Sequence, residues 1–155
     1  MAMRFWEDLE VGRPIEFGDK LVTRDEIVAF GLKYDPQPMH CDPAAAGRGA
    51  HGDVIASGWQ VGGFAMRLLA DGVLRDVASA GAPGVEKLRW LRPVLPGDRL
   101  RLRSTIQEKY PSRSRPTLGF VRNAHELVNQ RGEVVMTMAG IGMVLRRAAD
   151  QAGGA

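Results

Sequence analysis

The sequence has only one cysteine, Cys41, in 155 residues, which excludes a disulfide within the chain. Because disulfides persist mainly in oxidising compartments, this scarcity favours a reducing one. The sequence also lacks an apolar run of about 20 residues, the length that a membrane-spanning helix needs. Residues 1–12 contain Glu7, Asp8 and Glu10 and have no apolar core, so they do not resemble a secretory signal. We therefore expect a cytoplasmic protein that does not enter a membrane.

Aromatic residues are scarce as well, at 6% of the chain, and the net charge is only +3. The aromatic residues do not alternate with the basic ones, so the sequence offers no platform for stacking single-stranded nucleic acid. No DNA-binding motif is present. We expect no nucleic-acid partner, and a negatively charged small molecule would suit the modest basic bias.

The length and the hydrophobic fraction of 45% fit a single domain with a real core. We expect that domain to span residues 1–146. Residues 147–155 are rich in alanine and glycine, and we expect a flexible C-terminal tail there.

The first half of the chain contains clear helix signals. Residues 15–22 suit a first strand. Thr23 and Glu26 then match a capping box, and apolar residues follow at helical spacing until Pro36. Because two prolines stop this helix, we expect residues 35–40 to form an ordered loop directly after it.

A second, short helix is expected after Asp42, which precedes proline and can cap the helix start. Residues 57–74 then form the best long-helix candidate. Apolar residues cover most of its circumference, so we expect it to be buried on most sides. One face carries Trp59, Gly62, Gly63, Met66, Leu69 and Val73.

The second half of the chain has the patterns of strands. Alternation is clearest from Arg99 to Ile106, where leucines on one side alternate with arginines on the other, which predicts a basic outer face. Residues 133–145 are almost wholly apolar, as in a central strand covered on both faces. The expected strands are residues 84–92, 99–106, 117–128 and 133–145. We predict an α+β fold in which one curved antiparallel sheet wraps around the long helix.

Asp35 and His40 are the strongest candidates for acid–base chemistry. Histidine titrates near neutrality, and a carboxylate is a base at pH 7. Two prolines between them restrict the backbone and can fix the two side chains relative to each other. The spacing alone, however, favours a surface turn with a capping histidine.

Four blocks of sequence, in this order, resemble the MaoC-like dehydratase family, which includes the (R)-specific enoyl-CoA hydratases. They are residues 35–46 (DPQPMHCDPAAA), 55–58 (IASG), 89–98 (RWLRPVLPGD) and 129–135 (NQRGEVV). The resemblance implies the hotdog fold, in which an antiparallel sheet wraps around a long helix. It also implies a homodimer, or an assembly of dimers, with the sites at the subunit interface.

On this resemblance, Asp35 and His40 bind the water that is added to, or removed from, the C2=C3 bond of an enoyl-CoA-type thioester. We favour Asp35 as the principal base. The thioester oxygen gains negative charge during the reaction. The backbone N–H of Gly58, at the positive end of the long helix, is suited to stabilise that charge.

We expect Ser57, Gly63, Arg113 and Arg115 to contact the substrate. Gly63 takes the place of a serine found in some (R)-hydratases, which leaves more room and removes a hydroxyl. Arg113 and Arg115 are candidates for the phosphates of coenzyme A, although for any single arginine a solvated surface position is the favoured interpretation. Coenzyme A enters as part of the substrate, and we expect no separate cofactor.

No metal is expected, because the adjacent side chains of His40, Cys41 and Asp42 point in different directions. His125 lies within an expected strand, which suggests a structural role. Two other functions stay open. One is a hotdog acyl-CoA thioesterase, in which a carboxylate aids hydrolysis, and the other is a non-catalytic acyl-CoA-binding subunit, against which the intact Asp–His pair argues.

Overall fold

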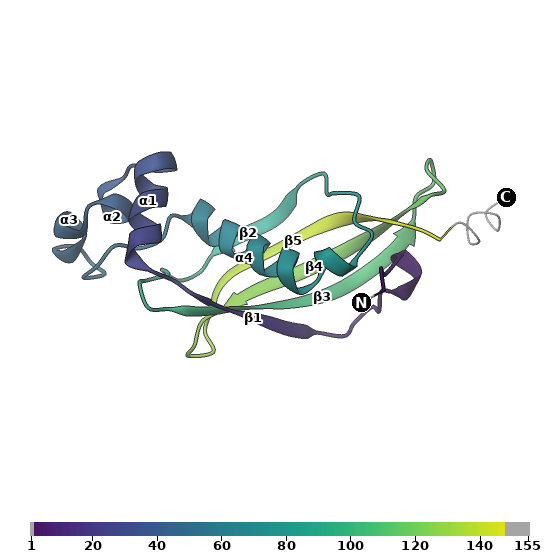
Figure 1. Ribbon diagram of the computed structural model, residues 1–155, viewed down its shortest axis with the longest axis horizontal. Helices are drawn as coiled ribbons and strands as arrows, with labels where there is room; N and C mark the ends of the chain where they lie inside the picture. The colour runs from purple at the N-terminus through teal and green to yellow at the C-terminus, as the bar shows by residue number, and fades with distance from the viewer. Residues whose placement is uncertain (1, 148–155) are drawn as a thin grey trace.

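A computed structural model describes residues 2–147 of the chain (Figure 1). Its elements in chain order are η1 (Trp6–Asp8), β1 (Ile15–Leu21), α1 (Arg24–Tyr34), α2 (Pro38–Cys41), α3 (Pro43–Gly47), α4 (Gly58–Gly72), η2 (Leu74–Asp76), β2 (Val85–Trp90), β3 (Arg99–Pro111), β4 (Leu118–Val128) and β5 (Val134–Leu145). Among the helices of residues 2–147, none combines the length and the apolar character that crossing a membrane requires.

The five strands form one antiparallel sheet in the order β1-β3-β4-β5-β2. Figure 1 shows α4 lying along one face of this curved sheet, with α1, α2 and α3 gathered at one end. The predicted α+β architecture is therefore confirmed. The core lies between helix and sheet, where Leu100, Leu102 and Leu127 of the strands cluster with Val61 and Ala65 of α4.

Helices α1 and α3 begin where the capping residues in the sequence predicted. The Thr23 hydroxyl accepts from the Glu26 amide at 3.2 Å, and the Glu26 carboxylate accepts from the Thr23 amide at 3.3 Å. Asp42 likewise accepts from two amides at the start of α3. The segment 35–40, however, is only partly a loop, because Pro38 begins α2. Proline suits the first position of a helix, where its missing N–H leaves no bond unmade.

Two expectations about burial were wrong for a single protomer. Helix α4 packs on the sheet with one face only, and Trp59 and Met66 on the other face are 68% and 46% exposed. Strand β5 lies inside the sheet, but most of its residues are only half-buried. The reason is the same in both cases. Both α4 and β5 have apolar residues on two opposite faces. A single chain has one helix layer and one sheet layer, so it buries only one face of each element.

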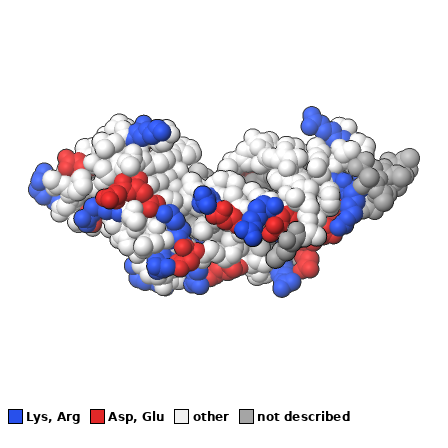
Figure 2. All heavy atoms as spheres, viewed as in Figure 1, with Lys and Arg blue, Asp and Glu red and all other residues white. Residues whose placement is uncertain are grey.

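The predicted basic face of residues 99–105 is neutralised by carboxylates on the two neighbouring strands. Arg103 contacts Glu126 of β4 at 2.9 Å and Glu16 of β1 at 3.2 Å, and Arg101 contacts Glu16 at 3.1 Å. Arg99 pairs with Asp19. Figure 2 shows the result on one face of the molecule, where basic and acidic side chains are interspersed. The sequence showed the arginines, but their partners depend on strand register.

The expected domain of residues 1–146 thus includes every helix and strand that the structure describes. Of the expected tail, residues 148–155 lie outside the described residues. Arg147 is described, and its guanidinium contacts the Asp8 carboxylate at 2.7 Å.

Gly31 determines how closely α1 approaches α2. A Cβ atom at this position would lie 2.8 Å from the carbonyl oxygen of His40 and 3.0 Å from its carbonyl carbon. Both neighbours are backbone atoms, so neither can move aside as a flexible side chain would. The missing side chain therefore allows the helix that ends next to Asp35 to pack directly on the turn that carries His40.

We predict that Gly31→Ala destabilises the protein, although alanine normally stabilises a helix interior relative to glycine. Overpacking of this kind costs about 1–3 kcal/mol. The matched control is Gly47→Ala at the end of α3, where the nearest atom to a Cβ would lie 3.9 Å away, an ordinary contact. The control should be unchanged or gain about 0.5–1 kcal/mol. Urea unfolding measures both, and a Gly31→Ala protein as stable as the parent would contradict the close approach.

Candidate active site

Asp35 and His40 lie together at the junction of α1 and α2, as the sequence predicted. Asp35 is the C-terminal cap of α1, where its amide donates to the Gly31 carbonyl at 2.9 Å. The Nε2 atom of His40 lies 3.4 Å from Oδ2 of Asp35, and the two side chains are only 8% and 20% exposed. The pair is thus shielded but not sealed from solvent.

Two neutral donors hold the Asp35 carboxylate. Gln37 Nε2 donates to Oδ1 at 2.7 Å, and Ser57 Oγ donates to Oδ2 at 2.7 Å. These bonds, with a smaller contribution from the charge of His40, lower the pKa of Asp35 below its ordinary value, against the opposing effect of burial. Asp35 is therefore ionised at neutral pH and can accept a proton.

The backbone fixes the proton on the His40 ring. Its Nδ1 atom lies 2.7 Å from the carbonyl oxygen of Ile55, which can only accept a hydrogen bond. Nδ1 must therefore carry a proton. In the neutral ring, Nε2 is then left as an acceptor facing Asp35. The Asp35 carboxylate and Nε2 of His40 are thus directed at one small region.

Ser57 is completely buried and is the N-terminal cap residue of α4, yet its side chain makes no capping bond to that helix. Its hydroxyl donates to Asp35 instead. The first amides of α4, including that of Gly58, thus lack a side-chain cap and carry the positive end of the helix dipole. This arrangement suits the stabilisation of a negative oxygen.

Gly58 also permits close packing by an aromatic ring. A Cβ at this position would lie 2.5 Å from Cε2 of Trp90. The Trp90 ring in turn meets that of Trp59 edge-on, with centroids 5.5 Å apart. His40, Gly58 and Trp90 line one cavity of about 380 Å³, and His51 and Arg92 lie on its wall as well. The cavity therefore brings the histidine of the pair next to the start of α4.

The other predicted site residues lie further away within one chain. Gly63 is exposed, six residues after Ser57 and so about 9 Å further along α4. Arg113 and Arg115 lie in the turn between β3 and β4, at the opposite end of the molecule from α1, α2 and α3 (Figure 1). The structure does not bring these three residues to Asp35 and His40, and their contact with substrate stays a prediction.

Sequence reasoning missed two groups of the site. Gln37 stands two residues after Asp35, a spacing that allows a side chain to reach back within a turn, so this signal was available. The carbonyl of Ile55 reaches the site through long-range pairing, such as the bond from the Ile55 amide to the Met39 carbonyl at 2.9 Å. No local pattern reveals that contact.

Cys41, which stands between His40 and Asp42, has a hydrogen-bond partner in the same segment. The thiol of Cys41 donates to the carbonyl of Gln37 at 3.2 Å, within its own helical turn. Across residues 2–147, no three histidine, cysteine or acidic side chains lie close enough together to hold a metal ion.

The chain is similar to a known protein family and to several solved structures. Residues 8–129 match the family described as MaoC-like domain. A MaoC-like dehydratase from Rhodospirillum rubrum is 37% identical, with a TM-score of 0.81 and coverage of 93% of this chain and 98% of that one. The R-hydratase PhaJ1 of Pseudomonas aeruginosa is 27% identical, with a TM-score of 0.76 and coverage of 92% and 86%.

Among proteins compared by sequence, the uncharacterized protein YdeM of Bacillus subtilis is 27% identical over 142 residues, which are 91% of this chain and 98% of that protein. Solved structures of MaoC-like proteins have the same sheet and central helix, so the predicted hotdog fold is confirmed.

We predict that Ser57→Ala raises the pKa of Asp35, because the variant removes one of the two donors that stabilise its charge. The acidic limb of any activity that needs ionised Asp35 should move to higher pH by the same amount. Ser112→Ala, in an exposed turn, is the matched control. Titration of the aspartate carboxyl carbons by NMR measures the shift, and an unchanged or lower value in Ser57→Ala would refute the role of the hydroxyl.

Proposed function

Because the chain belongs to the MaoC-like family of hydratases and dehydratases, we propose that it adds water to, or removes it from, the C2=C3 bond of an enoyl-CoA-type acyl thioester. The observation that supports this most strongly is that the two side chains converge at one point. The Asp35 carboxylate, whose pKa is lowered, and Nε2 of His40 lie 3.4 Å apart, beside the start of α4 that the Ser57 side chain does not cap.

In the proposed reaction, one water molecule donates hydrogen bonds to Asp35 and to Nε2 of His40. Its oxygen then attacks C3 of the enoyl group while one of its protons passes to the pair, with Asp35 as the principal base. A proton is delivered from the pair to C2, so the overall change is the addition of one water molecule. Dehydration is the same sequence reversed.

During this step the thioester oxygen gains negative charge. The amide of Gly58 is our proposed donor, because it lies at the start of α4 and lines the same cavity as His40. The loss of one donor of this kind typically raises a barrier by about 3 kcal/mol. The apolar rings of Trp59 and Trp90 would exclude water from the acyl group next to the reacting bond.

We also propose that two chains form a homodimer that completes the site. Apolar side chains are exposed on the outer face of α4, where Trp59 is 68% and Met66 46% exposed. Others are exposed at the edge strand β2 and just beyond it, where Val85 is 61% and Leu91 54% exposed. A second copy that covered them would bring its own surface to the cavity. Arg113 and Arg115, which lie far from the pair in one chain, would then be candidates to hold the coenzyme A phosphates of the neighbouring site.

The dimer is expected to sediment with twice the chain mass of 16.9 kDa. Leu91→Glu places a charge on the exposed apolar surface and should shift the population towards monomer. Glu10→Gln, on an exposed side chain elsewhere, is a control that should leave the mass unchanged. A parent protein that sediments as a monomer at micromolar concentration would refute this assembly.

We predict that Asp35→Asn and His40→Ala each lower the turnover of enoyl-CoA hydration by at least about 100-fold, the usual contribution of acid–base catalysis. The fold should be retained, because both side chains lie at the edge of the core. Asp71→Asn, which makes the same change at an exposed position of α4, should keep parental activity.

The assay follows a panel of enoyl-CoA and 3-hydroxyacyl-CoA thioesters by two signals, the absorbance of the conjugated double bond and the release of free thiol. Hydration activity that persists in folded Asp35→Asn would overturn the assignment. Thiol release without any change in the double bond would favour the thioesterase alternative, and no reaction with any thioester would favour a binding subunit.

A further inference from the structure

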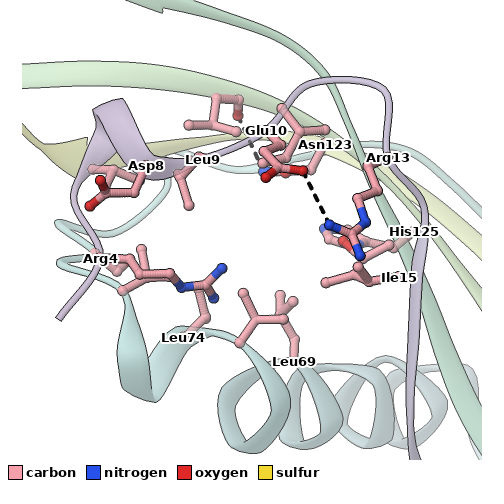
Figure 3. A pocket seen from close by; sticks show the side chains of 18 of the residues that line it. Arg4, Asp8, Leu9, Glu10, Arg13, Ile15, Leu69, Leu74, Asn123 and His125 are labelled. Atoms are coloured by element: carbon pink, nitrogen blue, oxygen red, sulfur yellow. Dashed lines mark hydrogen bonds and ion pairs between the residues drawn. The ribbon is translucent and has the colours of Figure 1, made fainter. Parts of the chain in front are cut away.

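A second cavity, of about 210 Å³, lies between the N-terminal segment, the C-terminal half of α4 and the inner face of the sheet (Figure 3). None of the residues that line it belongs to the Asp35–His40 pair or its hydrogen-bond partners. Leu69, on its wall, follows Ser57 by twelve residues, which is about 18 Å along the helix. The cavity is therefore separate from the proposed catalytic site.

The floor of this cavity is polar where a sheet that faces a helix is normally apolar. Ser104 of β3 pairs directly with His125 of β4, and Asn123 lies two residues before His125, so all three share one face of the sheet. Further along the same face, Leu100 and Leu102 are completely buried. The polar floor thus begins where the cavity begins.

His125 is the most informative of these residues. Its side chain is buried, with the residue only 8% exposed, and its Nδ1 atom has no hydrogen-bond partner within residues 2–147. Burial lowers the pKa of His125 to about 4, so the ring is neutral at pH 7. Buried polar atoms in proteins nearly always have a partner, and an exception indicates a missing one. A neutral imidazole nitrogen would bond well to a hydroxyl group, which can both donate and accept.

The opposite side of the cavity carries a free positive charge. Figure 3 shows the guanidinium of Arg4 extending into the open space, and Arg4 forms no ion pair with any residue in the described range 2–147. The other charges at this rim are compensated, since Arg13 contacts Glu10 at 3.4 Å and Asp8 contacts Arg147. The unmatched charge therefore favours an anion.

Between the polar floor and Arg4, the walls are apolar. They include Leu69 of α4, Val73 directly after that helix, and Ile106 and Val121 of the sheet. The volume is below the range of about 300–1,000 Å³ that is typical for drug-sized ligands, so a small molecule would fill it.

We propose that this cavity is a binding site for a small hydroxycarboxylic acid, distinct from the catalytic pair. The carboxylate contacts Arg4, the apolar chain lies against Leu69 and Val73, and the hydroxyl group bonds to the floor at His125. Such a ligand would connect the N-terminal segment to α4, the helix whose other end carries Gly58.

The three histidines of the chain allow a direct test, because each reports on a different place: His40 on the pair, His51 on the wall of the first cavity and His125 on the second. In full-length protein with ring-labelled histidine, NMR follows the three signals during titration with 3-hydroxyhexanoate. Hexanoate, which lacks the hydroxyl, and hexane-1,3-diol, which lacks the carboxylate, are the matched probes.

We expect 3-hydroxyhexanoate to shift the His125 signal and to bind at least about tenfold more tightly than either matched probe. Arg4→Gln should weaken its binding about tenfold or more, whereas Arg67→Gln, on the outer side of α4, should change it less than twofold. His125→Phe should remove the preference for the hydroxyl group. Asp35→Asn should bind as the parent does.

Three results would overturn the proposal. The first is a His125 signal that does not move at saturating 3-hydroxyhexanoate. The second is binding to Arg4→Gln that equals binding to the parent. The third is a shift of the His40 signal alone, with binding that is lost in Asp35→Asn, which would place the ligand in the catalytic site.

Discussion

The hydrogen bond from the Ser57 hydroxyl to the Asp35 carboxylate, at 2.7 Å, is the interaction on which the catalytic arrangement depends. It joins the end of α1 to the start of α4 and has two effects. It stabilises the charge on the base, and it takes from α4 the side chain that would otherwise cap the helix. A second link, from Gln60 Nε2 to the Glu26 carbonyl at 2.8 Å, holds the same two helices together. The sheet beneath α4 then keeps this junction in place, because completely buried residues such as Leu100 and Ala65 fill the space between them.

Most of the fold could be predicted because its signals are local. Thr23 and Glu26 define the start of α1, and the alternation from Arg99 to Ile106 defines a strand. The residues of the pair could also be found, because residues 35–46 resemble the MaoC-like family, whereas the spacing of Asp35 and His40 alone favours a surface turn. The predictions that failed concern the burial of α4 and the basic face of β3, and both of these depend on long-range partners. The pattern of α4 does not distinguish the face on the sheet from the face at the surface, because both are apolar. Nor does any local pattern show that acidic side chains of β1 and β4 neutralise the arginines of β3.

The two ends of α4 therefore have different environments. Its N-terminal end meets the acid–base pair and a cavity walled by Trp90, whereas its C-terminal half covers the polar floor around His125. A lone histidine within a strand suggests a structural role when only the sequence is known. Within residues 2–147, the structure leaves one ring nitrogen of His125 without a hydrogen-bond partner. It also places His125 on the wall of a cavity that contains Arg4, which has no ion pair in the same range. Both features depend on strand register and on the path of the N-terminal segment, which the sequence does not encode locally.

The central claim is that Asp35 and His40 direct water to C3 of an acyl thioester and a proton to C2. Reaction of an enoyl-CoA in ¹⁸O-labelled D₂O, followed by mass spectrometry of the product, tests this most directly. The account predicts an intact thioester that contains one ¹⁸O in a C3 hydroxyl group and one deuterium at C2. A free acid with ¹⁸O in its carboxylate, with the double bond intact and no deuterium at C2, would contradict it.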